Sequence, residues 1–204
     1  MIIIPDFGIG NLNSIQNMLK KIETNALISN KKTDIEAATK ILLPGMGHFD
    51  NCMQQLNKSG LRSIIEKKVV IEKVPVLGIC VGLQMLMESS EEGILPGLGW
   101  VKGKTVAFNK NLMPETHKVP NMGWLEIKEK KKSKLLENLD DARFYFAHSF
   151  HVMLNDCDDE LITANYGYDF TVGIEKENIL GVQFHPEKSH RFGMQLLKNF
   201  AANY

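Results

Sequence analysis

Short apolar runs alternate with helix-type sequence in the first half of the chain, and this alternation constrains the fold more than any other feature. The runs cover residues 2–4, 26–28, 40–43 and 74–79. Between the first two runs, apolar residues recur at helical steps of three and four, at Leu12, Ile15, Leu19 and Ile22. Short apolar strands separated by helices are typical of a parallel sheet that is covered on both faces. The sequence therefore predicts an α/β fold with a central, mostly parallel sheet flanked by helices.

The second half has a different sequence pattern, with β-type segments separated by polar turns. They lie at residues 101–108, 124–127, 144–147, 161–164 and 170–174. We expect them to form an additional, smaller β-rich layer, followed by a buried strand at 179–182 and a closing helix at 187–201. The lysine-rich run 128–132 is interpreted as a solvated turn. No linker or repeat divides the chain, so residues 1–204 are predicted to form a single domain.

Composition excludes several classes of function. Lys and Arg together number 24, as do Asp and Glu, and the zero net charge disfavours a nucleic-acid or anionic-membrane binder. No apolar stretch is long enough for a membrane span, and the start lacks the basic region of a signal peptide. The three cysteines are scattered and odd in number, which indicates no disulfide framework. We therefore expect a protein of the reducing cytoplasm.

A cysteine between two glycines lies where the fourth apolar run enters a helical segment. Residues 76–84 contain Gly78, Cys80 and Gly82, which is the cysteine counterpart of a nucleophile elbow. The glycines leave room for a tight strand-to-helix turn, and the helix N-terminus behind Cys80 favours the thiolate. The alternative is a small structural cysteine at the start of a helix. Cys52 and Cys157 have no such frame and are interpreted as structural thiols.

His185 is the candidate base, because it directly follows the strand predicted near residues 180–184. Sites in open α/β sheets form beyond the carboxyl ends of strands, so Cys80 and His185 are expected at one edge. Glu187 could fix the orientation of the imidazole, as the third member of a triad. A metal site built from His185, Glu187 and His190 lacks the usual ligand spacing, and we expect no metal.

Two further glycine-containing turns follow apolar runs. Pro44-Gly45-Met46-Gly47 could aim an amide N–H inward as an oxyanion hole, although an ordinary glycine turn is the alternative. Gly8-Ile9-Gly10 lacks the third glycine of a dinucleotide-binding loop, so a tight turn is favoured over a cofactor site.

Together, the segments 44–47, 78–84 and 183–187 resemble the class I, triad-type glutamine amidotransferases, in the order and at about the spacing of that family. The resemblance implies a flavodoxin-like fold. Within the family, the chain looks most like the glutaminase subunits of imidazole glycerol phosphate synthase. The segments 6–12, 120–124, 145–149 and 187–189 carry this finer similarity.

The resemblance implies hydrolysis of L-glutamine without a cofactor. Cys80 would attack the side-chain amide to form a glutamyl thioester, His185 would protonate the departing ammonia, and Glu187 would support the imidazolium. The implied oxyanion hole consists of Gly45, Met46 and Val81. The implied glutamine-binding residues are Gly47, Gln84, Ser149 and Phe150.

The resemblance also implies a partner, a (β/α)₈-barrel synthase subunit in a heterodimer. This subunit would use the ammonia to make imidazole glycerol phosphate and AICAR in histidine biosynthesis. The residues implied at the interface and ammonia gate are Asn121, Met122, Trp124, Tyr145 and Lys188.

Four positions depart from the family pattern, which usually has tyrosine, histidine, asparagine and tyrosine at Phe7, Asn121, Leu125 and Phe150, respectively. None of them is a catalytic group. Asn121 and Leu125 fall in the segment expected to face the partner, so a second hypothesis is a paralogue that feeds a related barrel in amidino-sugar synthesis for surface glycans. Two more remote hypotheses are a stand-alone γ-glutamyl hydrolase or cysteine peptidase, and a non-enzymatic interaction protein.

Overall fold

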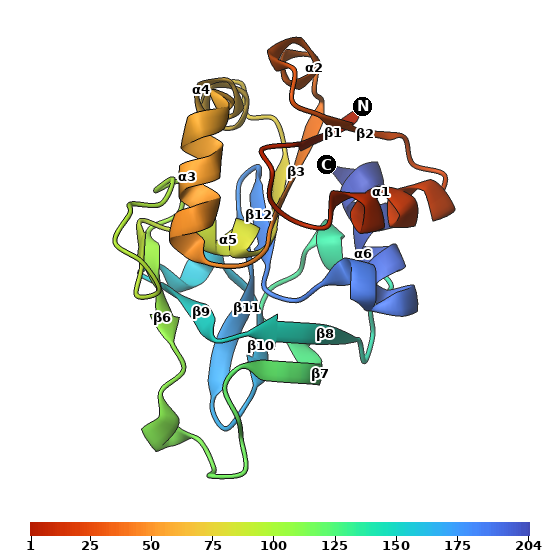
Figure 1. Ribbon diagram of the computed structural model, residues 1–204. Helices are drawn as coiled ribbons and strands as arrows, with labels where there is room; N and C mark the ends of the chain where they lie inside the picture. The colour runs from red at the N-terminus through yellow and green to blue at the C-terminus, as the bar shows by residue number, and fades with distance from the viewer.

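The computed structural model describes residues 1–204 as one mixed sheet with helices on both sides (Figure 1). Its main path runs in the order β2-β1-β3-β4-β12-β11-β10-β7-β8. The first five strands of this path are mutually parallel. They are β2 (Ala26–Ser29), β1 (Ile2–Pro5), β3 (Lys40–Gly45), β4 (Val76–Cys80) and β12 (Ile179–Val182). The prediction of a central parallel sheet is confirmed.

Helices cover the parallel strands on both faces. Figure 1 shows α1 (Leu12–Lys21) and α6 (His190–Asn203) on one side, and α3 (Phe49–Ser59) with α4 (Arg62–Glu66) on the other. The short helix α5 (Val81–Met85) follows β4 directly. The remaining helical segments are α2 (Lys32–Glu36), a π-helical turn at Lys67–Ile71 and 3₁₀ turns at Lys110–Leu112, Lys134–Leu136, Cys157–Asp159 and Pro186–Lys188.

The β-rich second half continues the same sheet, since β11 (Asp169–Lys176) pairs antiparallel with β12. Beyond it lie the antiparallel strands β10 (Glu160–Asn165), β7 (Asn121–Glu129) and β8 (Arg143–His148). A branch from β11 adds β9 (Phe150–Leu154), β6 (Gly103–Ala107) and β5 (Ser89–Ser90). One apolar core runs through both halves. No helix combines the length and the apolar character that crossing a bilayer requires.

Two local predictions were wrong. The closing helix does not begin at residue 187, because Pro186–Lys188 forms a 3₁₀ turn and α6 begins only at His190. The run 128–132 is not simply a turn, because its first two residues extend β7. Within that run, Lys131 Nζ donates to the Glu175 carbonyl oxygen at 2.8 Å, which ties the segment to the sheet.

Candidate active site

Cys80 lies in a strained turn between β4 and α5. Its backbone angles are φ 55° and ψ −114°, in a region that side-chain-bearing residues rarely adopt. Such strain is found where the surrounding structure enforces it, and it is frequent at active sites. The residue is 4% exposed. The local structure therefore has the strained strand-to-helix geometry of a nucleophile elbow, as the glycine–cysteine–glycine motif predicted.

The glycines around Cys80 are required by close backbone packing. A Cβ atom on Gly82 would overlap the carbonyl oxygen of Leu43 in β3. A Cβ atom on Gly45 would lie 2.5 Å from the Gly82 backbone nitrogen, and one on Gly78 would lie 2.8 Å from the Gly82 oxygen. The end of β3 is thus pressed against the first turn of α5. This contact brings the 44–47 segment beside Cys80.

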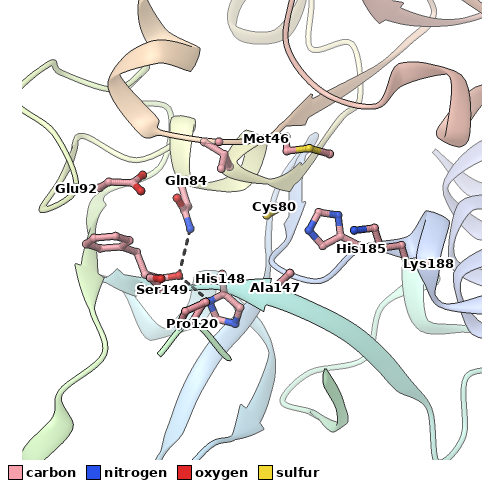
Figure 2. Close-up of a pocket in the computed structure, with 13 residues that line it drawn as sticks. Met46, Cys80, Gln84, Glu92, Pro120, Ala147, His148, Ser149, His185 and Lys188 are labelled. Carbon is pink, nitrogen blue, oxygen red and sulfur yellow. Dashed lines mark hydrogen bonds between the residues drawn. The ribbon is translucent and has the colours of Figure 1, made fainter. Parts of the chain in front are cut away.

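His185 and Glu187 meet Cys80 at the same edge of the sheet. The His185 Nδ1 atom lies 2.8 Å from Glu187 Oε1, and both side chains are almost fully buried, with exposed fractions of 5% and 4%. Burial lowers the pKa of His185, but interactions with Cys80 and Glu187 outweigh it and raise this pKa to about 10. The site therefore favours an imidazolium beside the sulfur. Figure 2 shows Cys80 and the His185 ring facing one cavity.

This cavity has a volume of about 300 Å³ and opens beside the sulfur. Nine of the residues singled out from the sequence line it, namely Met46, Gly47, Cys80, Val81, Gln84, Ser149, Phe150, His185 and Lys188. The other four lining residues are Glu92, Pro120, Ala147 and His148. Gly45 and Glu187 do not line the cavity, and Glu187 contacts it only through His185.

Four of the five expected interface residues lie at or near the rim of the cavity. Met122 and Trp124 are 65% and 41% exposed on β7, and the Trp124 ring stacks on His190 at 5.6 Å. The Lys188 ammonium lies 5.5 Å from the centre of the Tyr145 ring and also lines the cavity, so it links the cavity to this surface. We call the group Met122, Trp124, Tyr145 and Lys188 the rim surface.

Asn121 differs from the expectation that it faces a partner, because it is only 1% exposed. Side chains alternate along β7, so the residue before Met122 points inward. The Asn121 Nδ2 atom lies 3.3 Å from His148 Nε2. Asn121 therefore supports the cavity wall from behind.

Sequence reasoning missed two polar groups of the cavity. The Glu92 carboxylate lines it and accepts a 2.8 Å hydrogen bond from the Phe49 backbone N–H at the start of α3. His148 donates from Nδ1 to the Phe150 carbonyl oxygen at 2.7 Å. Burial lowers the pKa of His148 to about 3, so its ring is neutral. His148 lay within a motif segment, whereas no motif or spacing pointed to Glu92.

The fold and the site define an α/β protein with a buried cysteine at a nucleophile elbow, paired with a histidine and a glutamate. The family model described as glutamine amidotransferase class-I matches residues 3–204. The chain belongs to the class I glutamine amidotransferase family.

Named relatives and solved structures agree with this assignment. The chain is 50% identical to "Imidazole glycerol phosphate synthase subunit HisH 2" of Methanococcus maripaludis, over 98% of each chain. It is 48% identical to the subunit HisH of Bdellovibrio bacteriovorus, over 98% of this chain and 99% of that one. A crystal structure described as a glutamine amidotransferase superposes with a TM-score of 0.72 at 17% identity, over 98% of this chain and 97% of the other. At that identity the superposition shows the fold alone.

Proposed function

We propose that the chain is the glutaminase subunit of an imidazole glycerol phosphate synthase of histidine biosynthesis. It would hydrolyse L-glutamine at Cys80 and pass the ammonia to a (β/α)₈-barrel synthase subunit. The observation that carries the proposal is the buried Cys80–His185–Glu187 arrangement, in a chain similar over its full length to proteins of that name.

The chemistry follows from the proton held at His185. The Cys80 sulfur attacks the carbon of the side-chain amide, and the resulting oxyanion is stabilised by the Val81 N–H and the Gly45–Met46 peptide. The imidazolium gives its proton to the departing nitrogen, so the C–N bond breaks and ammonia leaves. Water, deprotonated by the now neutral His185, then hydrolyses the thioester to glutamate. Glu187 stabilises the imidazolium in both steps.

The polar groups of the cavity suit the amino-acid end of glutamine. Gln84 donates from Nε2 to the Phe150 carbonyl oxygen at 3.2 Å and to Gln183 Oε1 at 3.1 Å, so its own Oε1 atom is left as an acceptor. This oxygen and the Glu92 carboxylate would receive the α-ammonium group. Gly47 and Ser149 would hold the α-carboxylate through N–H and hydroxyl donors.

The rim surface is the proposed route to the partner. It exposes apolar and aromatic side chains beside the cavity, a combination that is enriched in protein interfaces.

Three free cysteines without a disulfide support a reducing, cytoplasmic location, and one continuous core supports a single domain over 1–204. A paralogue serving a barrel in amidino-sugar synthesis is the second candidate, suggested by the departures at Asn121 and Leu125. However, Asn121 is buried and Leu125 packs against the core, so neither residue favours it through direct contact with a partner.

Ammonia release tests the glutaminase proposal. Cys80→Ala, assayed with glutamine in the presence of the barrel subunit, should abolish turnover. Cys157→Ala is the matched control, because Cys157 is exposed and outside the cavity, and it should retain full activity. Unchanged turnover in Cys80→Ala would contradict the proposal. The barrel that co-purifies from the native cell separates the two candidate pathways.

A further inference from the structure

Gln183 lies beside the nucleophile, and the reaction proposed for Cys80, His185 and Glu187 gives it no role. Its side chain is completely buried. The Gln183 Nε2 atom donates toward the Cys80 sulfur at 3.7 Å, while its Oε1 atom accepts from Gln84 Nε2 at 3.1 Å. One amide group therefore touches both the sulfur and a residue of the proposed glutamine site.

Strand register places Gln183 next to Cys80. In the parallel pairing of β4 with β12, Ile79 is opposite Val182. The next residues are Cys80, the last residue of β4, and Gln183, the first residue after β12, so the two side chains are neighbours as the strands end. The Gln183 backbone N–H donates to the Val172 carbonyl oxygen of β11 at 2.8 Å, so this residue is still held by the sheet.

The hydrogen-bond network fixes which end of the Gln183 amide faces the sulfur. The Phe150 carbonyl oxygen can only accept, so the Gln84 amide must turn its NH₂ group toward it. The second hydrogen of that NH₂ group then points to Gln183, which must present its oxygen. The Gln183 NH₂ group is thereby directed at Cys80.

His148 holds the same carbonyl oxygen from the other side. Its Nδ1 atom donates to the Phe150 oxygen, which leaves Nε2 to accept from Asn121. Each member of the series has one consistent orientation. The buried series Asn121–His148–Phe150–Gln84–Gln183 thus ends on a donor that points at the nucleophile.

We propose that Gln183 is a positioning residue that holds the Cys80 sulfur as a hydrogen-bond acceptor and is itself oriented by Gln84. A donor directed at sulfur stabilises the thiolate more than the thiol, because hydrogen bonds to charged groups are the stronger ones. Gln183 also couples the glutamine-binding residue to the nucleophile. The role in catalysis depends on the proposed glutaminase function, whereas the effect on the sulfur does not.

Alkylation of Cys80 as a function of pH tests the proposal without substrate or partner. The full-length chain is treated with iodoacetamide over a pH series, and each cysteine is followed by mass spectrometry of its peptide. Cys157 is exposed and serves as an internal reference in every sample. Since only the thiolate reacts, the profile reports the fraction of thiolate at each cysteine.

Six titratable groups lie around Cys80 or act on it through His185, and their protonation bears on this profile. They are His185 after β12, Glu187 and Lys188 of the 3₁₀ turn that follows it, His148 of β8, Glu92 after β5 and Cys52 of α3. His148 stays neutral, because burial lowers its pKa to about 3, and Cys52 stays protonated to high pH, because burial raises its pKa to about 11. A substitution at Gln183 keeps all six groups, so a displaced profile in a variant that adds no charge reports the loss of the amide donor.

The informative variants are Gln183→Met and Gln183→Glu. Gln183→Met removes the donor at similar volume and should slow Cys80 alkylation at neutral pH about tenfold, with the profile displaced to higher pH. Gln183→Glu keeps an acceptor for Gln84 but places a carboxylate beside the sulfur, so the displacement should be larger. If one variant fails to fold, the other still tests the proposal. A cooperative thermal unfolding transition shows which variants are folded.

Asn199→Leu is the matched control for loss of a buried amide. Asn199 is 4% exposed and donates to the carbonyl oxygens of Leu135 and Glu137, away from the cavity. It should lower the melting temperature and leave the Cys80 profile unchanged. If the profile of folded Gln183→Met or Gln183→Glu coincides with that of the unaltered chain, the proposal is wrong. Displaced profiles in the variants, together with an unaltered chain that releases no ammonia with its barrel partner, would support the effect on sulfur and contradict the glutaminase function.

Discussion

Replacing Glu187 by glutamine separates the charge of this residue from its hydrogen bond. The carboxylate binds the imidazole only through Oε1, at 2.8 Å, and its Oε2 atom is buried without a hydrogen-bond partner. Nothing in the chain therefore requires the NH₂ group of a glutamine to face His185. Glu187→Gln should turn its oxygen to the Nδ1–H group and keep the productive tautomer.

The magnitude follows from the lost charge. At about 4 Å and an effective dielectric constant of about 20, two unit charges attract by about 4 kcal/mol, which sets an upper bound of roughly 10³ in rate. The substitution also replaces a charged hydrogen bond of about 1.5–3 kcal/mol by a neutral one of about 0.5–1.5 kcal/mol. This difference sets a lower bound of about tenfold on the loss of rate. We expect kcat for glutamine hydrolysis to fall by about 10²–10³, below the roughly 10⁴ that follows when an amide enforces the wrong tautomer in a serine triad.

The pH dependence of kcat shows in which direction the substitution moves the pKa of His185. Glu187 is one of the two groups that raise the pKa of His185 to about 10, so its neutral replacement lowers that pKa. The imidazolium is then lost earlier as pH rises, and the alkaline limb of the kcat profile should move to lower pH. Steady-state ammonia release with the barrel partner measures both effects, and Glu187→Asp is the control that keeps a charge. A threefold loss or less with an unmoved alkaline limb would refute the role of the carboxylate.

Three more substitutions have outcomes that the geometry determines. Gly82→Ala should destabilise the fold by about 3 kcal/mol or more, because its Cβ would overlap the Leu43 oxygen, whereas Gly8→Ala, with a positive φ of 83° but no neighbour within 4 Å, should cost about 1–2 kcal/mol; equal melting temperatures would contradict this. Glu92→Gln keeps an acceptor for the Phe49 N–H and should raise KM for glutamine at least about tenfold with kcat little changed; an unaltered KM would exclude Glu92 from substrate binding. Trp124→Ala should weaken partner binding in calorimetry by about 1–3 kcal/mol, and equal affinity would remove Trp124 from the interface.

The parallel half of the fold was predictable because each strand has its signal in contiguous residues. The runs at 2–4 and 40–43 are apolar almost throughout, as strands buried on both faces must be. The run 26–28 is equally apolar, although it forms the edge strand β2, in which Leu27 is 37% exposed. Helix α3 was not predicted, although its buried residues Phe49, Cys52, Met53 and Leu56 have helical spacing. Strand β9 is short and follows β8 after a single residue, so no turn signal separates the two.

Some residues of the candidate site could be placed from the sequence, whereas others could not. Cys80 and His185 follow predicted strands, so their shared edge could be inferred from topology alone. Glu92 reaches the cavity from the segment after the two-residue strand β5, whose place depends on pairing with β6. Asn121 was expected at the surface, and only the register of β7 against β8 shows that its side chain faces His148. Long-range pairing of this kind leaves no local trace in a single sequence.

The arrangement of three adjacent strands explains why Cys80 can keep its strained backbone. Gly45 of β3 is opposite Cys80 of β4, and Gln183 follows β12 on the other side. Cys80 is therefore held between the Gly45 backbone and the Gln183 amide, and neither neighbour can move without disturbing the sheet. By contrast, Met46 is 40% exposed, and Gly47 has φ 93° with space around its Cα. Because the sulfur is fixed whereas this loop has room to change, we expect any control exerted by a partner to act on the Gly45–Met46 peptide, which is proposed to form the oxyanion hole, rather than on Cys80.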